Sequence, residues 1–123
     1  MTHNEAVQIL DKAIAEINAM RNIGIYNDSD IRVKGKSIKD IAYHAMSNAG
    51  ADATMLNSLS SVSFESQYTG DLAFQAFGRR EINRGLETTY RNGLTAVVNL
   101  LDKERETHLQ AIQAQEQNKS LAE

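Results

Sequence analysis

The chain contains no cysteine, no proline and no tryptophan, and only 6% of its 123 residues are aromatic. Without cysteine there is no disulfide framework, no thiol nucleophile and no thiolate metal site. Without proline, no residue of this type kinks or breaks a long helix. No hydrophobic run approaches the length of a membrane span, and the N-terminus lacks the basic-then-apolar layout of a signal peptide. We therefore expect a cytoplasmic protein without a membrane partner.

The charge balance is small: 13 basic residues stand against 16 acidic ones, a net charge of −3. This charge gives no overall attraction to nucleic acid, which we do not expect as a partner, so any anion binding must be local. The composition, with 41% hydrophobic and 24% charged residues, is typical of a folded chain. We expect a single helical domain over residues 1–115 and a polar tail over 116–123 that frays.

The last third of the chain predicts one long amphipathic helix from about Arg79 to about Gln115. Starting from Ile82, apolar or small residues recur at steps of three and four: Leu86, Tyr90, Gly93, Leu94, Val97, Leu101, His108 and Ile112. The earlier Phe74 and Phe77 fall on a different side of this helix. We therefore expect a kink or a helix junction near Gly78, because glycine costs roughly 1 kcal/mol in a helix interior.

The N-terminal part of the chain predicts a first helix and then a loop. Thr2 and Glu5 have the spacing of a capping box, and the helix that they begin is expected to end near Gly24. Residues 25–36 combine turn-forming Asn, Asp and Ser with a basic second half. We interpret them as a loop with at most a short turn of helix.

Two further helices are predicted between this loop and the long helix. Ser37 is the expected N-cap of the first, which should stop near Gly50, and Asp52 is the expected N-cap of a short second one. A serine-rich connection anchored by Phe64 follows. The predicted fold is all-α: an antiparallel bundle of about four helices with one long C-terminal helix.

The long helix is expected to extend beyond its partners. Roughly 35 residues of helix span about 50 Å, whereas the roughly 20 residues of the first helix span about 30 Å. Three apolar side chains near its end should then be exposed: Leu101, Leu109 and Ile112. We expect a homo-oligomer, most simply a two-fold dimer, formed through residues 94–112. The alternative is that the helix breaks near Gly93 or Asn99 and folds back.

No catalytic or metal-binding pattern is visible in the sequence. His3, His44 and His108 are far apart and form no H-x-x-x-H or H-E-x-x-H pair, and the serines lack a G-x-S-x-G elbow. No glycine pattern matches a phosphate loop. Gly85 and Gly93 indicate instead the close approach of another helix or of a ligand. We therefore expect no enzyme activity, no cofactor and no metal ion.

The strongest binding candidate is the basic run G-R-R-E-I-N-R-G-L-E-T-T-Y-R-N. Arginine recognises phosphate or carboxylate through its planar fork, and a tyrosine can stack on a base. The alternative is a solvated face, in which glutamates three or four residues away pair with these arginines. With a mobile rim from residues 25–36, the candidate ligand-binding residues are Arg79, Arg80, Arg84, Arg91, Tyr90, Phe77, Arg32 and Lys34.

Two stretches share their order with a known family. One is S-I-K-D-I-A-Y-H-A-M, followed by L-N-S-L and V-S-F, and the other is Y-R-N-G-L-T-A-V-V-N-L-L-D. Over residues 37–108 they resemble the helical accessory domain found beside TIR-like effector domains in bacterial antiphage defence proteins. Only Tyr90, Gly93 and Leu94 carry over, as structural matches. The resemblance implies a stand-alone phage or prophage module that binds a signalling nucleotide or a defence protein.

These observations lead to one functional expectation and one alternative. The first is a non-catalytic oligomeric protein that captures a small anionic ligand, with a nucleotide signal as the leading candidate, in the manner of an anti-defence sponge. The alternative is a protein–protein interaction module, or an inhibitor, that uses the apolar face of the long helix.

Overall fold

The computed structural model describes the backbone of residues 2–22, 28–64 and 70–122, and the side chains in these ranges except those of 28–29, 70–84 and 118–122. Within these ranges every regular element is a helix, which confirms the all-α prediction. The elements are α1 (His3–Ala19), α2 (Asp28–Asn48), α3 (Ala53–Ser60) and α4 (Gly70–Ala122). None of the described helices has the length and apolarity to cross a membrane.

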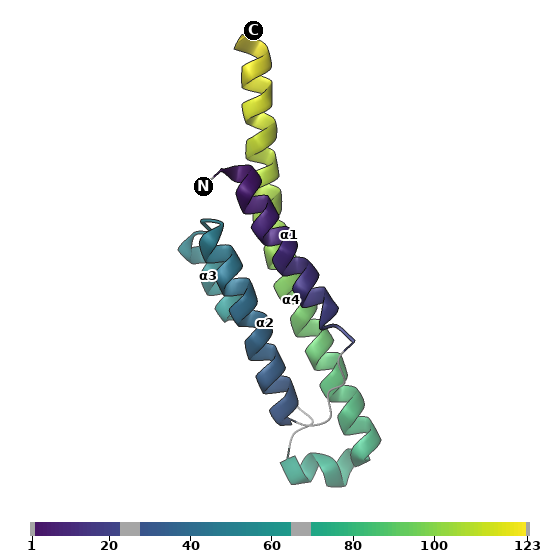
Figure 1. Cartoon of the computed structure of the whole chain (residues 1–123). Coiled ribbons are helices and arrows are strands. Elements are labelled where there is room, and N and C mark those ends of the chain that lie inside the picture. The colour runs from purple at the N-terminus through teal and green to yellow at the C-terminus, as the bar shows by residue number, and fades with distance from the viewer. Residues whose placement is uncertain (1, 23–27, 65–69, 123) are drawn as a thin grey trace.

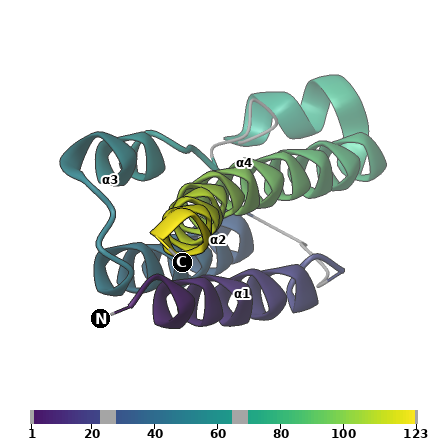
Figure 2. The ribbon, with the colours of Figure 1, turned by 90° about the horizontal axis from the view of Figure 1, so that it is seen from above.

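Three helices, α1, α2 and α4, lie side by side and enclose the core (Figures 1 and 2). Figure 1 shows that α1 runs in the opposite direction to both α2 and α4, so α2 and α4 run the same way. The short α3 contacts α2 and α4 and brings the chain back along them. Only part of the bundle is therefore antiparallel, because the return path between α2 and α4 is made by α3 and the segment after it.

The N-terminus of α1 has Thr2 as its N-cap, which is the first half of the predicted capping box. The Thr2 hydroxyl accepts a hydrogen bond from the backbone N–H of Glu5 at 3.1 Å, which satisfies one of the free donors of the first turn. The buried residues of α1 recur at steps of three and four: Ala6, Leu10, Ala13 and Ile17. This spacing puts one apolar stripe against the rest of the core.

The loop prediction for residues 25–36 is wrong from Asp28 onward, because α2 begins there. Ile31 and Gly35 are buried, and they continue the apolar stripe of α2 upstream of Ser37. The polar residues between them form the solvated face of a helix. Ser37 is consequently an exposed residue inside α2 and not its N-cap. Residues 25–27 lie outside the described ranges.

The end of α2 is where the sequence predicts it. Gly50 has a φ of +83°, a left-handed conformation that glycine adopts readily. Its N–H donates to the carbonyl of Ser47 at 3.1 Å, and the N–H of Ala51 donates to the carbonyl of Met46 at 2.9 Å. These two bonds form a Schellman motif, which satisfies carbonyls at the helix end. Asp52 then caps α3, as predicted, by accepting from the N–H of Met55.

The long C-terminal helix is confirmed, and its ribbon bends in its N-terminal part (Figure 1). The kink near Gly78 stays a prediction. The alternative, a helix that folds back midway, does not occur. The expected exposure of Leu101 is wrong: this side chain is 0% exposed, because α1 packs along that part of α4. Leu109 and Ile112 are half-buried. The backbone is helical to Ala122.

Candidate functional site

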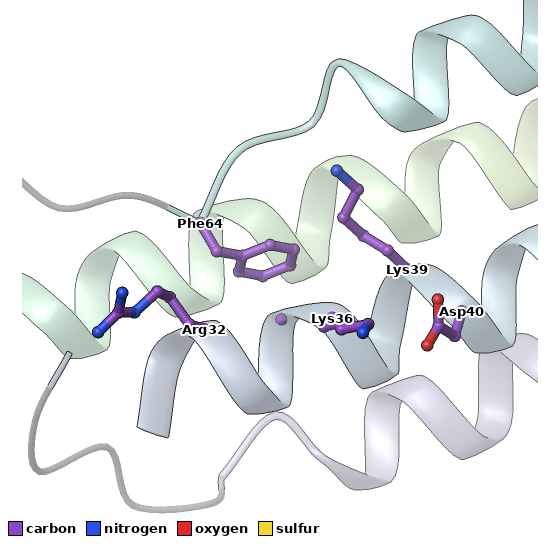
Figure 3. A pocket seen from close by; sticks show the side chains of 6 residues that line it. Arg32, Lys36, Lys39, Asp40 and Phe64 are labelled. Atoms are coloured by element: carbon purple, nitrogen blue, oxygen red, sulfur yellow. The ribbon is translucent and has the colours of Figure 1, made fainter. Parts of the chain in front are cut away.

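The segment after α3 places one aromatic ring, that of Phe64, between α2 and α4 (Figure 3). A Cβ atom added to Gly35 would lie 2.6 Å from Cγ of Phe64, and one added to Gly93 would lie 2.5 Å from its Cε1. Both distances are shorter than real Cβ atoms permit, so the two glycines provide the space that the ring occupies. The predicted anchoring role of Phe64 is thereby confirmed. The close approach at Gly93 is made by this side chain and not by the backbone of another helix, which was the expected neighbour.

Lys39 holds the same segment in place from α2. Its ammonium group donates to the carbonyl of Ser60 at 3.0 Å and to the carbonyl of Val62 at 2.8 Å. These are charge-assisted hydrogen bonds to backbone groups that no helix partner satisfies. The cation of Lys39 therefore has a fixed position beside Phe64.

A cavity of about 290 Å³ opens on this side of α2 (Figure 3). Six of the described residues line it: Arg32, Gly35, Lys36, Lys39, Asp40 and Phe64. Arg32, Lys36 and Lys39 follow one another at steps of four and three, so they share a face of the helix. Three cations and one carboxylate thus surround an aromatic floor, an arrangement that suits a small anion with an apolar part.

Of the predicted site residues whose side chains the structure describes, only Arg32 lines this cavity. Lys34 is half-buried on α2 outside it, and Arg91 is exposed on α4. The side chains of Arg79, Arg80, Arg84 and Phe77 lie outside those that the structure describes. The sequence reasoning missed Lys36 and Lys39, although helical spacing from Arg32 would have found them had residues 28–36 been taken as helix.

Tyr90 does not have the position that its predicted role requires. Its side chain is 1% exposed, and its hydroxyl donates to the carbonyl of Met20 at 2.6 Å. The centre of its ring lies 6.2 Å from that of Phe64. Burial raises the pKa of the Tyr90 hydroxyl. The residue belongs to the core, where it joins α4 to the end of α1, and it is not a surface on which a base can stack.

A second polar group lies where the N-terminus of α1 meets α4. Nδ1 of His3 is 2.8 Å from Nδ1 of His108, and Nε2 of His108 is 3.2 Å from Oε1 of Glu104. His108 and Glu104 are both buried, with 9% of each exposed. A carboxylate oxygen accepts, so Nε2 of His108 donates to Oε1 of Glu104. The hydrogen bond between the two Nδ1 atoms needs one proton, which the two rings share.

This histidine pair borders a second cavity, of about 230 Å³. The lining consists of Thr2, His3, Ala6, Asn48, Ala49, Gly50 and His108. Among the side chains that the structure describes, no three His, Asp or Glu residues are grouped so that all could bind one metal ion. The two histidines nonetheless come together from positions that are 105 residues apart.

Comparison with protein-family models, with curated proteins and with solved structures finds no match to this chain. The resemblance to the helical accessory domain of antiphage defence proteins therefore stays a prediction.

Proposed function

We propose that this chain is a non-catalytic binding protein that takes a small anionic ligand in the cavity beside Phe64. The observation that carries the proposal is the set of three cations, Arg32, Lys36 and Lys39, around one opening (Figure 3). The site is proposed in place of the basic run of α4, because the described geometry assembles these side chains around a volume that a ligand can enter.

The electrostatics of α2 favour an anion at this position. Like charges three or four residues apart on a helix destabilise it by about 0.2–0.5 kcal/mol for each pair. Arg32 with Lys36, and Lys36 with Lys39, are such pairs. A phosphate or carboxylate among them removes this repulsion and adds charge-assisted hydrogen bonds. Asp40 stands at one end of the row, and its charge should hold the anionic group toward Arg32 and Lys36.

The size of the cavity favours a small molecule over a polymer. Its volume of about 290 Å³ is near the lower limit of about 300–1,000 Å³ that is usual for ligand pockets. A nucleotide meets both requirements, since its phosphates match the cations and its base can contact the apolar floor. The proposed resemblance to a defence-associated module points to the same class, a nucleotide signal that the protein would sequester.

Isothermal titration against inorganic phosphate, pyrophosphate and a panel of mono- and dinucleotides tests this proposal. We expect at least one phosphate compound to bind. The Lys36→Ala variant should bind it at least 10-fold more weakly, because Lys36 is an exposed cation at the opening. Lys34→Ala is the matched control, since Lys34 belongs to the same helix but does not line the cavity. Absence of binding, or equal losses in the two variants, would contradict the proposal.

The alternative, a protein-interaction module or self-association through the long helix, has weaker support. Leu94, Val97 and Leu101 are buried within one chain, so most of residues 94–112 offers no free apolar stripe. What favours it is the end of α4, which projects past α1 (Figure 1) and carries the half-buried Leu109 and Ile112. Light scattering at micromolar concentration tests self-association: a monomeric mass would exclude the homo-oligomer.

A further inference from the structure

We propose that His3 and His108 form a binding site for a divalent transition-metal ion of the zinc class. Their Nδ1 atoms lie 2.8 Å apart and face each other across the junction of α1 and α4. Imidazole binds zinc at about 2.0–2.1 Å, which puts two nitrogens of a tetrahedral site about 3.3 Å apart. Binding therefore requires the two nitrogens to separate by about 0.5 Å and the His3 ring to turn, so that both lone pairs meet at an ion beside the Nδ1–Nδ1 line instead of pointing at each other. His3, which is only half-buried, has room for this movement.

Glu104 supplies the support that metal-binding histidines normally have. Its Oε1 lies 3.2 Å from Nε2 of His108, the nitrogen that faces away from His3. A carboxylate in this position keeps the proton on Nε2 and leaves Nδ1 free to bind the metal. The hydrogen bond also fixes the orientation of the ring. Glu104 is therefore a positioning residue that acts through His108, and it does not bind the ion.

The cavity of about 230 Å³ beside the two rings provides the remaining coordination positions. Water, or an oxygen of Thr2 or Asn48 on its wall, can fill them. With two protein ligands, the site should bind less tightly than a closed site that has four. It is separate from the anion site, since it borders the C-terminal end of α2, and it does not depend on the proposed function.

Binding here has a structural consequence that can be measured. His3 is the first residue of α1, and His108 lies on α4. An ion held by both joins the two helices and binds only the folded chain, so it stabilises that chain in proportion to the logarithm of its concentration. Zn²⁺ should therefore raise the melting temperature of the protein.

The test is titration of the purified, metal-free full chain with Zn²⁺ by calorimetry, with Co²⁺ as a spectroscopic probe. We expect one Zn²⁺ for each chain, a rise in melting temperature, and a visible Co²⁺ absorption band. His3→Ala and His108→Ala should each weaken Zn²⁺ binding at least 10-fold and remove the Co²⁺ band. Glu104→Gln should weaken binding by about 10-fold. His44→Ala is the matched control, because His44 is exposed on α2, and it should bind like the unchanged protein.

Three results would overturn the proposal: no stoichiometric Zn²⁺ binding by the unchanged chain, binding that is lost in His44→Ala, or binding that survives in His108→Ala. The last result would place the ion on His3 alone. Circular dichroism of each variant checks its fold. If His108→Ala does not fold, the His3→Ala variant provides the test instead. His3 lies in the first turn of α1 and outside the core, so its replacement should leave the core unchanged.

Discussion

Gly35 of α2 and Gly93 of α4 contact the same aromatic ring, that of Phe64, from two different helices. A Cβ atom at Gly35 would meet the Cβ–Cγ end of this side chain, and one at Gly93 would meet its Cε1 edge. The packing of the bundle and the shape of the cavity therefore depend on the same side chain, because the ring that fills the space between α2 and α4 also lines the cavity.

Gly93→Ala should therefore destabilise the protein. In an isolated helix the change stabilises by about 1 kcal/mol, but forcing a methyl group into a packed ring costs about 1–3 kcal/mol. We expect a net loss of about 1 kcal/mol in the free energy of unfolding, measured in urea. In a Phe64→Ala background the clash is absent, so the same change should become neutral or stabilising. A loss of equal size in both backgrounds would show that the ring is not the cause.

Tyr90→Phe should lower stability through a single hydrogen bond. The Tyr90 hydroxyl donates to the carbonyl of Met20. Removal of the hydroxyl leaves this partly buried carbonyl without that hydrogen bond. Losses of this kind are about 0.5–1.5 kcal/mol. Tyr43→Phe is the control, because Tyr43 is 47% exposed, and it should change the unfolding midpoint in urea by much less. Equal effects of the two changes would contradict the assignment.

The same residue predicts how stability depends on alkaline pH. Burial raises the pKa of Tyr90 in the folded state above the value of about 10 in the unfolded chain. The folded protein then holds this proton more tightly, so its stabilising contribution is complete below about pH 10 and is lost as the pH rises through the folded-state pKa. Urea unfolding between pH 8 and 11 should show this decline in the unchanged protein and a smaller one in Tyr90→Phe. Parallel curves would exclude Tyr90 as the source.

Lys39→Ala should destabilise the connection between α3 and α4. In the folded chain the partly exposed ammonium group of Lys39 donates to the carbonyls of Ser60 and Val62, and the change removes both hydrogen bonds. We expect a loss of about 1–2 kcal/mol in the free energy of unfolding. Lys34→Ala, on the same helix and with no such bonds to this segment, should stay within about 0.5 kcal/mol of the unchanged protein.

The helix stripes and caps of this fold can be predicted from the sequence because they depend on neighbouring residues. Thr2, Gly50 and Asp52 act locally, through hydrogen bonds or a backbone conformation that spans a few positions. The start of α2 could not be predicted in the same way. Its Asp and Ser residues are turn formers when taken alone, and only the packing of Ile31 and Gly35 against the core shows that they belong to a helix.

The histidine site depends on a contact between distant parts of the chain, which the sequence does not reveal. No second histidine lies near His3 or His108 in the sequence, and the antiparallel packing of α1 on α4 brings the two together. Tyr90 sits in a run of basic and polar residues, which suggested a binding role. Its helical spacing from Leu86 and Leu94 already placed it on the buried stripe, and that spacing was the better guide.

The anion site is best tested by titrating the isotope-labelled protein and following its amide chemical shifts in NMR spectra. The probe is pyrophosphate, or the nucleotide that binds best in calorimetry. We expect the largest shift changes at residues 32–40 and 62–64, which include the lining of the cavity. Changes confined to the basic run of α4, or no saturable change at all, would contradict the proposal.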